Sequence, residues 1–201
     1  MKHFNHLTLL ILVLFFLAAC SARPPEPVDQ AAMLTPWLEH RDKMRALESW
    51  TVQGRVGART GSEGANFNVY WQQQDTDYNI RLSGPLGQGG ASISGGFGWA
   101  ELRTSDDVFY AQSLDELLSE TTSLELPLHH LQYWMRGIPA PGTRAGIKLN
   151  SDALLEQLEQ YGWSVQYESY HADTQLPHRF NIRFEDNSAR IIISSWELTG
   201  A

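Results

Sequence analysis

From Trp50 onward, apolar and polar side chains alternate along three consecutive runs of the chain. Turn-forming segments at 61–64 and 74–77 separate these runs. The apolar positions are Trp50, Val52, Val56 and Ala58, then Phe67, Val69 and Trp71, then Tyr78, Ile80 and Leu82. A period of two puts successive side chains on opposite faces of a sheet. The pattern therefore predicts an antiparallel meander with one dry face and one wet face.

Shorter stretches extend this sheet toward the C-terminus. We expect strands near 90–94, 97–103 and 108–110, because glycines and polar turns bound each of them. Residues 180–184 alternate again, and 191–196 read as a buried last strand. The chain is thus predicted to carry one long meandering sheet.

Helices are predicted in two places. A helical repeat of apolar residues favours a helix over about 30–48, with Thr35 as a candidate N-cap and Pro36 at the first helical position. A short helix begins at its cap Ser113, and another covers 127–136. Helices segregated from a meandering sheet define an α+β fold.

Residues 151–161 give conflicting signals. Leu154, Leu155 and Leu158 have helical spacing, which favours a helix. Gly162 and the alternation over 163–167 favour a hairpin instead. Periodicity alone predicts a helix over this segment.

The N-terminal segment has the features of an export signal. Lys2 precedes an apolar run of about 13 residues, too short to span a bilayer. The run ends Leu-Ala-Ala-Cys, with Cys20 the single cysteine of the chain. This ending resembles a bacterial lipobox, in which the cysteine is acylated and becomes the new N-terminus. Ser21 in place of aspartate then suggests an outer-membrane address. The alternatives are a core helix and an ordinary secretory signal with a buried cysteine.

We therefore divide the chain into a signal peptide (1–19), an acylated Pro-rich tether (20–30) and a single domain (31–201). The formal charge is −8, and it becomes −9 on cleavage because residues 1–19 contain Lys2 and no acidic residue. An acidic domain repels phosphate backbones, so nucleic-acid binding is not expected. Membrane attachment must come from lipid and apolar groups.

The sequence contains no motif that is typical of a catalytic site. His129 and His130 are adjacent on a predicted helix and point to different faces, so we expect no metal site there. The glycine-rich stretch 84–98 lacks a dinucleotide fingerprint and precedes a strand. No nucleophile elbow surrounds the serines, although a dispersed triad is not excluded by sequence. We predict a non-enzyme without catalytic residues, cofactor or metal.

The aromatic content leaves two options for the interior. Seven Trp, seven Tyr and eight Phe supply enough apolar area for a solid core or for a lined cavity. From the residues alone a solid core is slightly favoured, because most apolar strand faces are core.

Several motifs together resemble the LolB family of outer-membrane lipoprotein receptors. They run in order through the mature chain, and Ser-Gly-Pro-Leu-Gly and Tyr-Trp-Met-Arg-Gly-Ile-Pro are the most specific. The matching segments are the lipobox, Trp50 with Gln53–Val56, Tyr70–Gln72, Leu82–Gly87, Leu131–Pro139 and Gly162–Trp163. The resemblance implies an incomplete antiparallel β-barrel whose helices cover an apolar cavity for acyl chains. It also implies that 151–161 is strand rather than helix.

The function implied by this resemblance needs no covalent chemistry. A LolA-like periplasmic carrier would bring an acylated lipoprotein, which this protein would accept and insert into the lipids of the outer membrane. The protein would be lipid-anchored, would face the periplasm and is expected to be a monomer. Two alternatives are a structural or assembly lipoprotein that binds a partner through its sheet edge, and an anchored hydrolase.

The resemblance assigns candidate residues as well. Leu86, between Pro85 and Gly87, matches an exposed leucine that the family needs for membrane insertion of cargo. Without the resemblance, a leucine folded back into the barrel mouth would be favoured. The residues whose apolar faces are candidates to line the cavity, or to support helix packing instead, are Trp50, Val52, Phe67, Val69, Trp71, Ile80, Leu82, Trp134 and Trp196.

Overall fold

One long antiparallel sheet dominates the computed structural model, which describes residues 28–85, 89–121 and 128–199. Cys20, Leu86 and Gly87 lie outside the described residues. The strands are β1 (Ser49–Thr60), β2 (Glu63–Gln74), β3 (Asp77–Ser83), β4 (Gly90–Gly96), β5 (Trp99–Arg103), β6 (Val108–Ala111), β7 (Gly146–Leu149), β8 (Leu155–Gln160), β9 (Trp163–Tyr170), β10 (Pro177–Phe184) and β11 (Asn187–Leu198).

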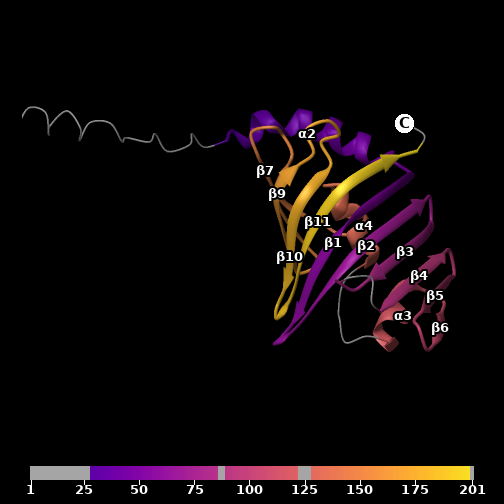
Figure 1. Cartoon of the computed structure of the whole chain (residues 1–201). Coiled ribbons are helices and arrows are strands. Elements are labelled where there is room, and N and C mark those ends of the chain that lie inside the picture. The colour runs from indigo at the N-terminus through magenta and orange to yellow at the C-terminus, as the bar shows by residue number, and fades with distance from the viewer. Residues whose placement is uncertain (1–27, 86–88, 122–127, 200–201) are drawn as a thin grey trace, which may run out of the picture.

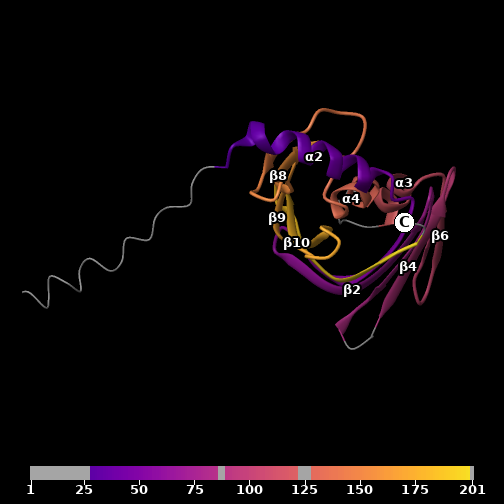
Figure 2. The ribbon, with the colours of Figure 1, turned by 90° about the horizontal axis from the view of Figure 1, so that it is seen from above.

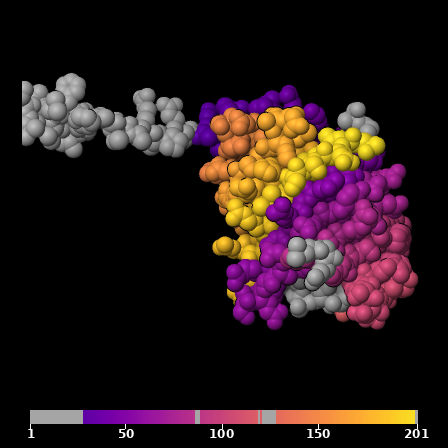
Figure 3. All heavy atoms as spheres, viewed as in Figure 1, coloured from indigo at the N-terminus to yellow at the C-terminus, as the bar shows by residue number. Residues whose placement is uncertain are grey.

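The sheet consists of two meanders joined in the middle. Its strand order is β6-β5-β4-β3-β2-β1-β11-β10-β9-β8-β7, so the first and last strands of the domain are neighbours. β1 and β11 pair over nearly their whole length, for example Val52 opposite Trp196 and Thr60 opposite Asn187. Figure 3 shows β11 in yellow lying beside the purple atoms of β1. The edges β6 and β7 do not meet, which confirms the predicted α+β fold with an open barrel.

Three described helices cover this sheet. α2 (Gln30–Arg45) crosses the end where β1 begins and β11 finishes, as Figure 1 shows. We call this the α2 end. α3 (Leu114–Thr121) and α4 (Leu128–Met135) come between the two meanders in sequence, and both lie within the curve of the sheet (Figure 2). In the described ranges, none of the helices is long and apolar enough to cross a bilayer.

α2 begins at Gln30, where the predicted helix over about 30–48 begins, but the predicted N-cap at Thr35 was wrong. The N-cap is Asp29, whose carboxylate accepts hydrogen bonds from the backbone N–H groups of Ala31 (3.0 Å) and Ala32 (3.3 Å). The helix therefore begins well before Thr35, and Pro36 lies inside it. Pro36 is exposed, so the backbone carbonyl that loses its partner there is near water.

The segment 151–161 is not a helix, so the periodicity was wrong and the strand implied by resemblance is confirmed. β8 occupies Leu155–Gln160. Leu149 pairs with Leu155, but Lys148 pairs with Gln157, so Glu156 is an extra residue in a bulge. The bulge turns both Leu155 and Leu158 inward, which produces a helix-like spacing within a strand.

Tryptophans fill the interior at the α2 end. The ring of Trp50 lies 5.6 Å from that of Trp71 and 5.5 Å from that of Trp196. Trp37 and Met44 of α2 are buried in the same core cluster. Arg136, after α4, donates hydrogen bonds from Nη1 to the carbonyls of Met44 (3.1 Å) and Leu47 (2.8 Å). This end of the barrel is therefore closed.

Candidate functional site

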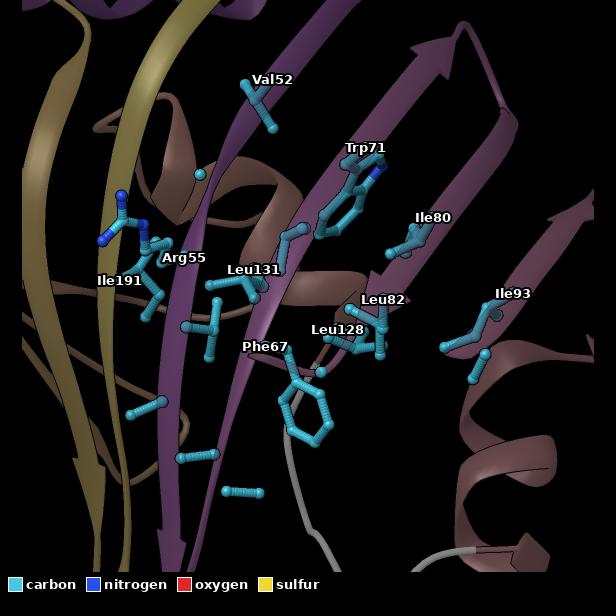
Figure 4. A pocket seen from close by; sticks show the side chains of 18 of the residues that line it. Val52, Arg55, Phe67, Trp71, Ile80, Leu82, Ile93, Leu128, Leu131 and Ile191 are labelled. Atoms are coloured by element: carbon cyan, nitrogen blue, oxygen red, sulfur yellow. The ribbon is translucent and has the colours of Figure 1, made fainter. Parts of the chain in front are cut away.

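An apolar cavity of about 610 Å³ lies between the concave face of the sheet and the helices α3 and α4. Figure 4 shows side chains from β1 to β4 pointing toward Leu128 and Leu131 of α4. Its volume falls within the roughly 300–1,000 Å³ that is usual for a small-molecule site. Along β1 the lining runs from Val52 to Thr60, about 27 Å at the rise of a strand. The cavity is thus long, narrow and apolar. The sequence favoured a solid core instead, and the cavity corrects that expectation.

Six of the nine predicted cavity residues line it. They come from three adjacent strands and are Val52, Phe67, Val69, Trp71, Ile80 and Leu82. Strand register brings them together, because Val52 pairs with Trp71 and Trp71 pairs with Ile80. Alternation along each strand was sufficient to identify this wall.

The other three predicted residues lie outside the lining. Trp50 is buried between Trp71 and Trp196 at the closed end. The indole N–H of Trp196 donates to the carbonyl of Pro177 (3.1 Å). The indole N–H of Trp134 donates to Oε1 of Gln160 (3.1 Å). Buried indole N–H groups need acceptors, and these acceptors hold the rings in the packed core rather than at the cavity.

The opposite wall and the cover were not predicted. They consist of Ala91, Ile93, Leu102, Leu118, Leu128, Leu131, Met135, Ile182, Ala189, Ile191 and Ile193. A signal for the cover was present, because Leu128, Leu131 and Met135 have the i, i+3, i+7 spacing of one helix face. The sequence does not reveal which meander this face covers.

The cavity opens away from α2. Its lining is buried at Val52 and Ile93 but exposed at Glu63, Gly64 and Gly89, which lie at the far ends of their strands. We call this the mouth end. The lining interior is aliphatic and aromatic, and its two charged residues, Arg55 and Glu63, are both exposed. Such an arrangement can solvate an apolar chain but offers it no buried charge.

The loop between β3 and β4 begins and ends at the mouth of the cavity. The N–H of Gly84 donates to the carbonyl of Gly89 (3.1 Å), which closes the base of the loop. Gly89 has a φ of +63°, a conformation that favours glycine. Pro85 is exposed, and Gly84, Gly89 and Gly90 belong to the cavity lining. The loop that carries the predicted Leu86 therefore starts and ends at the rim.

Polar contacts connect the two cover helices to each other and to the sheet. Nδ1 of His129 lies 2.7 Å from Oδ1 of Asp115 on α3. The His130 ring stacks on Tyr161, with centroids 3.9 Å apart. Burial, and secondly the charge of His129, lower the pKa of His130 to about 4, against an opposing effect of Asp115. The two rings also lie beside each other, with centroids 3.6 Å apart, so the prediction that they point to different faces was wrong.

Titratable groups elsewhere do not form a metal site among the residues described. Within those ranges, no group of three or more His, Cys, Asp or Glu side chains is placed to hold a metal ion. Burial, and secondly Asp115, raise the pKa of Tyr78 to about 12, so this phenol stays neutral.

Comparison with known proteins agrees with this geometry. The family model described as "Outer membrane lipoprotein LolB" matches residues 48–196. The chain is 34% identical over 185 residues to the outer-membrane lipoprotein LolB of Stutzerimonas stutzeri, covering 90% of each chain. It is 32% identical over 196 residues to that of Pseudomonas syringae pv. syringae, covering 96% of each.

Solved structures show the same fold at low sequence identity. A LolA superfamily protein from Nitrosomonas europaea superposes with a TM-score of 0.56 at 11% identity, over 87% of this chain and 96% of that one. A DUF1329 family protein from Desulfovibrio piger also gives a TM-score of 0.56, at 7% identity, over 87% of this chain and 95% of that one.

Proposed function

This chain belongs to the LolB family of outer-membrane lipoproteins, and we propose that it accepts acylated lipoproteins from a LolA-like periplasmic carrier and inserts them into the outer membrane. The observation that carries the proposal is the apolar cavity of about 610 Å³, open at the mouth end. Family membership makes the protein a lipid-anchored outer-membrane protein, and the cavity suggests what it does there.

Transfer through the cavity needs no covalent step. An acyl chain leaves the carrier and enters a lining of aliphatic and aromatic side chains. Each CH₂ that leaves water contributes roughly 0.8 kcal/mol, in the cavity as in the bilayer. Cargo can therefore move along a series of apolar environments of increasing affinity, without a nucleotide.

We assign delivery to the loop between β3 and β4. Its base is fixed by the Gly84–Gly89 hydrogen bond, and Pro85 is exposed beside the mouth. Leu86 is the apolar residue between Pro85 and Gly87, and on this assignment it enters the bilayer and guides cargo out of the cavity.

A transfer assay tests both steps. An acylated lipoprotein bound to the carrier is mixed with this protein and then with liposomes, using wild type, Leu86→Glu and the control Gln88→Glu, which adds the same charge to the same loop. We expect all three to take cargo from the carrier and only Leu86→Glu to retain it.

Two results would contradict the assignment. If no variant takes cargo, the receptor function is wrong and a partner-binding lipoprotein becomes the better account. If Leu86→Glu lowers the free energy of unfolding by more than about 2 kcal/mol, Leu86 is buried rather than a membrane probe.

Anchoring is proposed to depend on acylation of Cys20. The end of the predicted tether, residues 20–30, overlaps α2, which has its N-cap at Asp29 and begins at Gln30, so the folded domain begins slightly before the predicted boundary at 31. Cys20→Ala behind an ordinary secretory signal should yield a soluble periplasmic protein. Fractionation of this variant with the outer membrane would refute the lipid anchor.

A further inference from the structure

A shallow groove crosses the outer face of the first meander, on the side of the sheet away from α3 and α4. Figure 3 looks onto this face, where β1 to β4 lie side by side. Within the described part of the chain, the groove is lined by no aspartate or glutamate but by three exposed arginines, Arg55, Arg81 and Arg103. The whole chain has a formal charge of −8, so the groove is opposite in sign to the molecule that carries it. We call it the arginine groove.

Strand alternation and register place two of these arginines in one row. Arg81 lies between Ile80 and Leu82, which line the cavity, so its own side chain points outward. Arg81 pairs with Ser92, and Ser92 pairs with Arg103. Two strand spacings, about 10 Å, therefore separate the backbones of the two arginines, with a serine between them.

The positive charge of Arg55 and Arg81 is not balanced within the fold. Neither side chain forms an ion pair with another residue of the described ranges. Arg81 instead lies over the ring of Tyr70, with Cζ 4.2 Å from the ring centroid, which restrains the guanidinium without neutralising it. Arg103 does pair with Glu101 (2.9 Å). The unneutralised charge of the groove therefore comes from Arg55 and Arg81.

The donors of the arginine groove suit a phosphate group. A guanidinium presents its N–H donors in one plane and binds phosphate oxygens in pairs. Hydroxyl and amide side chains supply further donors, and those of the lining include Asn68, Ser83, Ser92, Thr104 and Ser195. The groove therefore combines positive charge with neutral donors, as a phosphate site requires.

The position of the groove indicates which phosphates it meets. Ser83 and Gly90 line the groove and pair with each other at the base of the loop between β3 and β4. Arg81 lies two residues before Ser83, about 7 Å along β3. The headgroup layer of a bilayer is roughly 6 Å deep on each side, so a long arginine side chain reaches it once the loop enters the lipid.

We propose that the arginine groove binds the phosphate groups of membrane lipids and holds the outer face of the first meander against the bilayer. The proposal rests on the proposed function in one respect, that the loop between β3 and β4 meets the outer membrane. Anionic lipid repels an acidic molecule at long range, and the arginines offset this repulsion at contact. The contact keeps the cavity mouth at the lipid surface during delivery.

Site-specific quenching tests the proposal on the full-length acylated protein in vesicles of phosphatidylethanolamine and phosphatidylglycerol. Cys20 is the single cysteine, so a fluorophore can be attached at Gln72→Cys on β2 or at Gln166→Cys on β9, both exposed positions of the outer face. Register across the sheet aligns Gln166 with Asn66, so position 166 is nearer the mouth end than position 72. A molecule upright on its mouth would bring 166 closer to the lipid, whereas contact through the groove brings 72 closer.

A nitroxide on a neutral lipid should quench the label at 72 roughly threefold more than the label at 166, because the arginine contacts hold that face at the headgroups. Arg55→Gln combined with Arg81→Gln should abolish this difference. The matched control is Arg179→Gln combined with Arg190→Gln, which removes two charges that lie 3.8 and 2.9 Å from Glu168 on the second meander. This control should retain the difference.

Two further conditions identify the ligand. Vesicles of a galactolipid, which contains no phosphate, should show no quenching difference with the wild-type protein. An excess of inorganic phosphate should leave the difference on phospholipid unchanged, because the inserted loop keeps lipid phosphates beside the groove. Loss of the difference in inorganic phosphate would make the groove a site for free phosphate and would overturn the lipid assignment.

Three other outcomes would overturn the proposal: equal quenching of the two labels, a difference that persists without Arg55 and Arg81, or a difference that persists on galactolipid. A groove that binds an acidic protein instead would give equal quenching on vesicles alone. Cargo transfer on the same vesicles separates this inference from the receptor function. Normal transfer with equal quenching refutes only the groove contact, and a quenching difference without transfer refutes only the receptor function.

Discussion

At the scale of single residues, Gln160 connects the cover to the sheet. Its buried amide makes four hydrogen bonds: Oε1 accepts from Trp134 Nε1 (3.1 Å) and Ala140 N (2.9 Å), while Nε2 donates to the carbonyls of Ala140 (2.7 Å) and Thr143 (3.3 Å). Gln160→Leu should lower the free energy of unfolding by about 2–4 kcal/mol, because these buried groups lose their partners.

Urea unfolding measures this effect, and Gln157→Leu is the control. The Gln157 amide is on the same strand and bonds to exposed Glu159 (2.8 Å), so its loss should change stability by no more than about 0.5 kcal/mol. Equal effects of the two substitutions would show that the Gln160 network does not stabilise the fold.

His130 predicts a pH dependence of stability. Burial lowers its folded-state pKa to about 4 from an ordinary value of 6.5, so the unfolded chain takes up this proton first. The stability of the folded protein should therefore fall as the pH drops from about 6.5 to about 4, and this residue adds no further loss below that. Urea unfolding across this pH range should show that the free energy of unfolding falls less steeply with pH for His130→Gln than for wild type. If it falls equally steeply for both proteins, protonation of His130 does not cause the loss of stability.

At the scale of elements, the junction of β1 and β11 depends on Gly54. The register shifts between Gln53 and Gly54, and a Cβ at Gly54 would lie 2.3 Å from the carbonyl oxygen of Ile192. The neighbouring backbone cannot move aside easily, so Gly54→Ala should destabilise the protein by about 2 kcal/mol or more. This contact gives a physical reason for the Gln53–Val56 motif.

Gly64→Ala on β2 is the matched control for thermal or urea unfolding. An added Cβ there would meet its nearest atom at 3.5 Å, an ordinary contact. Both substitutions reduce the freedom of the unfolded chain alike, so their difference reports the clash alone. A Gly54→Ala protein as stable as Gly64→Ala would mean that the two strands can separate slightly without cost.

The same scale shows what the sequence could predict. The strands of the first meander follow from alternation, because each has one face on the interior and one in water. β8 was not predictable by periodicity, since the bulge at Glu156 changes the spacing of Leu155 and Leu158 from two to three. The N-cap of α2 was assigned to the wrong residue because Asp29 and Thr35 are both acceptable caps, and only tertiary packing chooses between them.

At the scale of the whole molecule, the cavity exists because the two cover helices are much shorter than the central strands of the sheet. α3 and α4 have eight residues each, about 12 Å, while β1, β2 and β11 have 12 residues each, about 40 Å. Helices this short cover part of the concave face and leave the rest lined but unfilled. A sequence reveals which faces are apolar, yet it does not reveal whether the facing elements are long enough to fill the space between them.

A large side chain that fills part of the cavity should therefore weaken the binding of an acyl chain without unfolding the protein. Ala91 faces the cavity on β4, and Ala91→Trp places an indole where a bound chain would lie. If the indole displaces two or three methylene groups at about 0.8 kcal/mol each, affinity for a fluorescent fatty acid should fall roughly 15- to 60-fold. Stability should change by less than about 1 kcal/mol, because the ring occupies existing volume.

Ser92→Trp is the control, because Ser92 lies next in the strand and belongs to the groove on the outer face. It should bind the fatty acid like wild type. Unchanged affinity of Ala91→Trp would place the acyl chain outside the cavity. A loss of more than about 2 kcal/mol in the free energy of unfolding would show that the space is packed in solution. Reduced affinity with retained stability is the combination that only a real, open cavity produces.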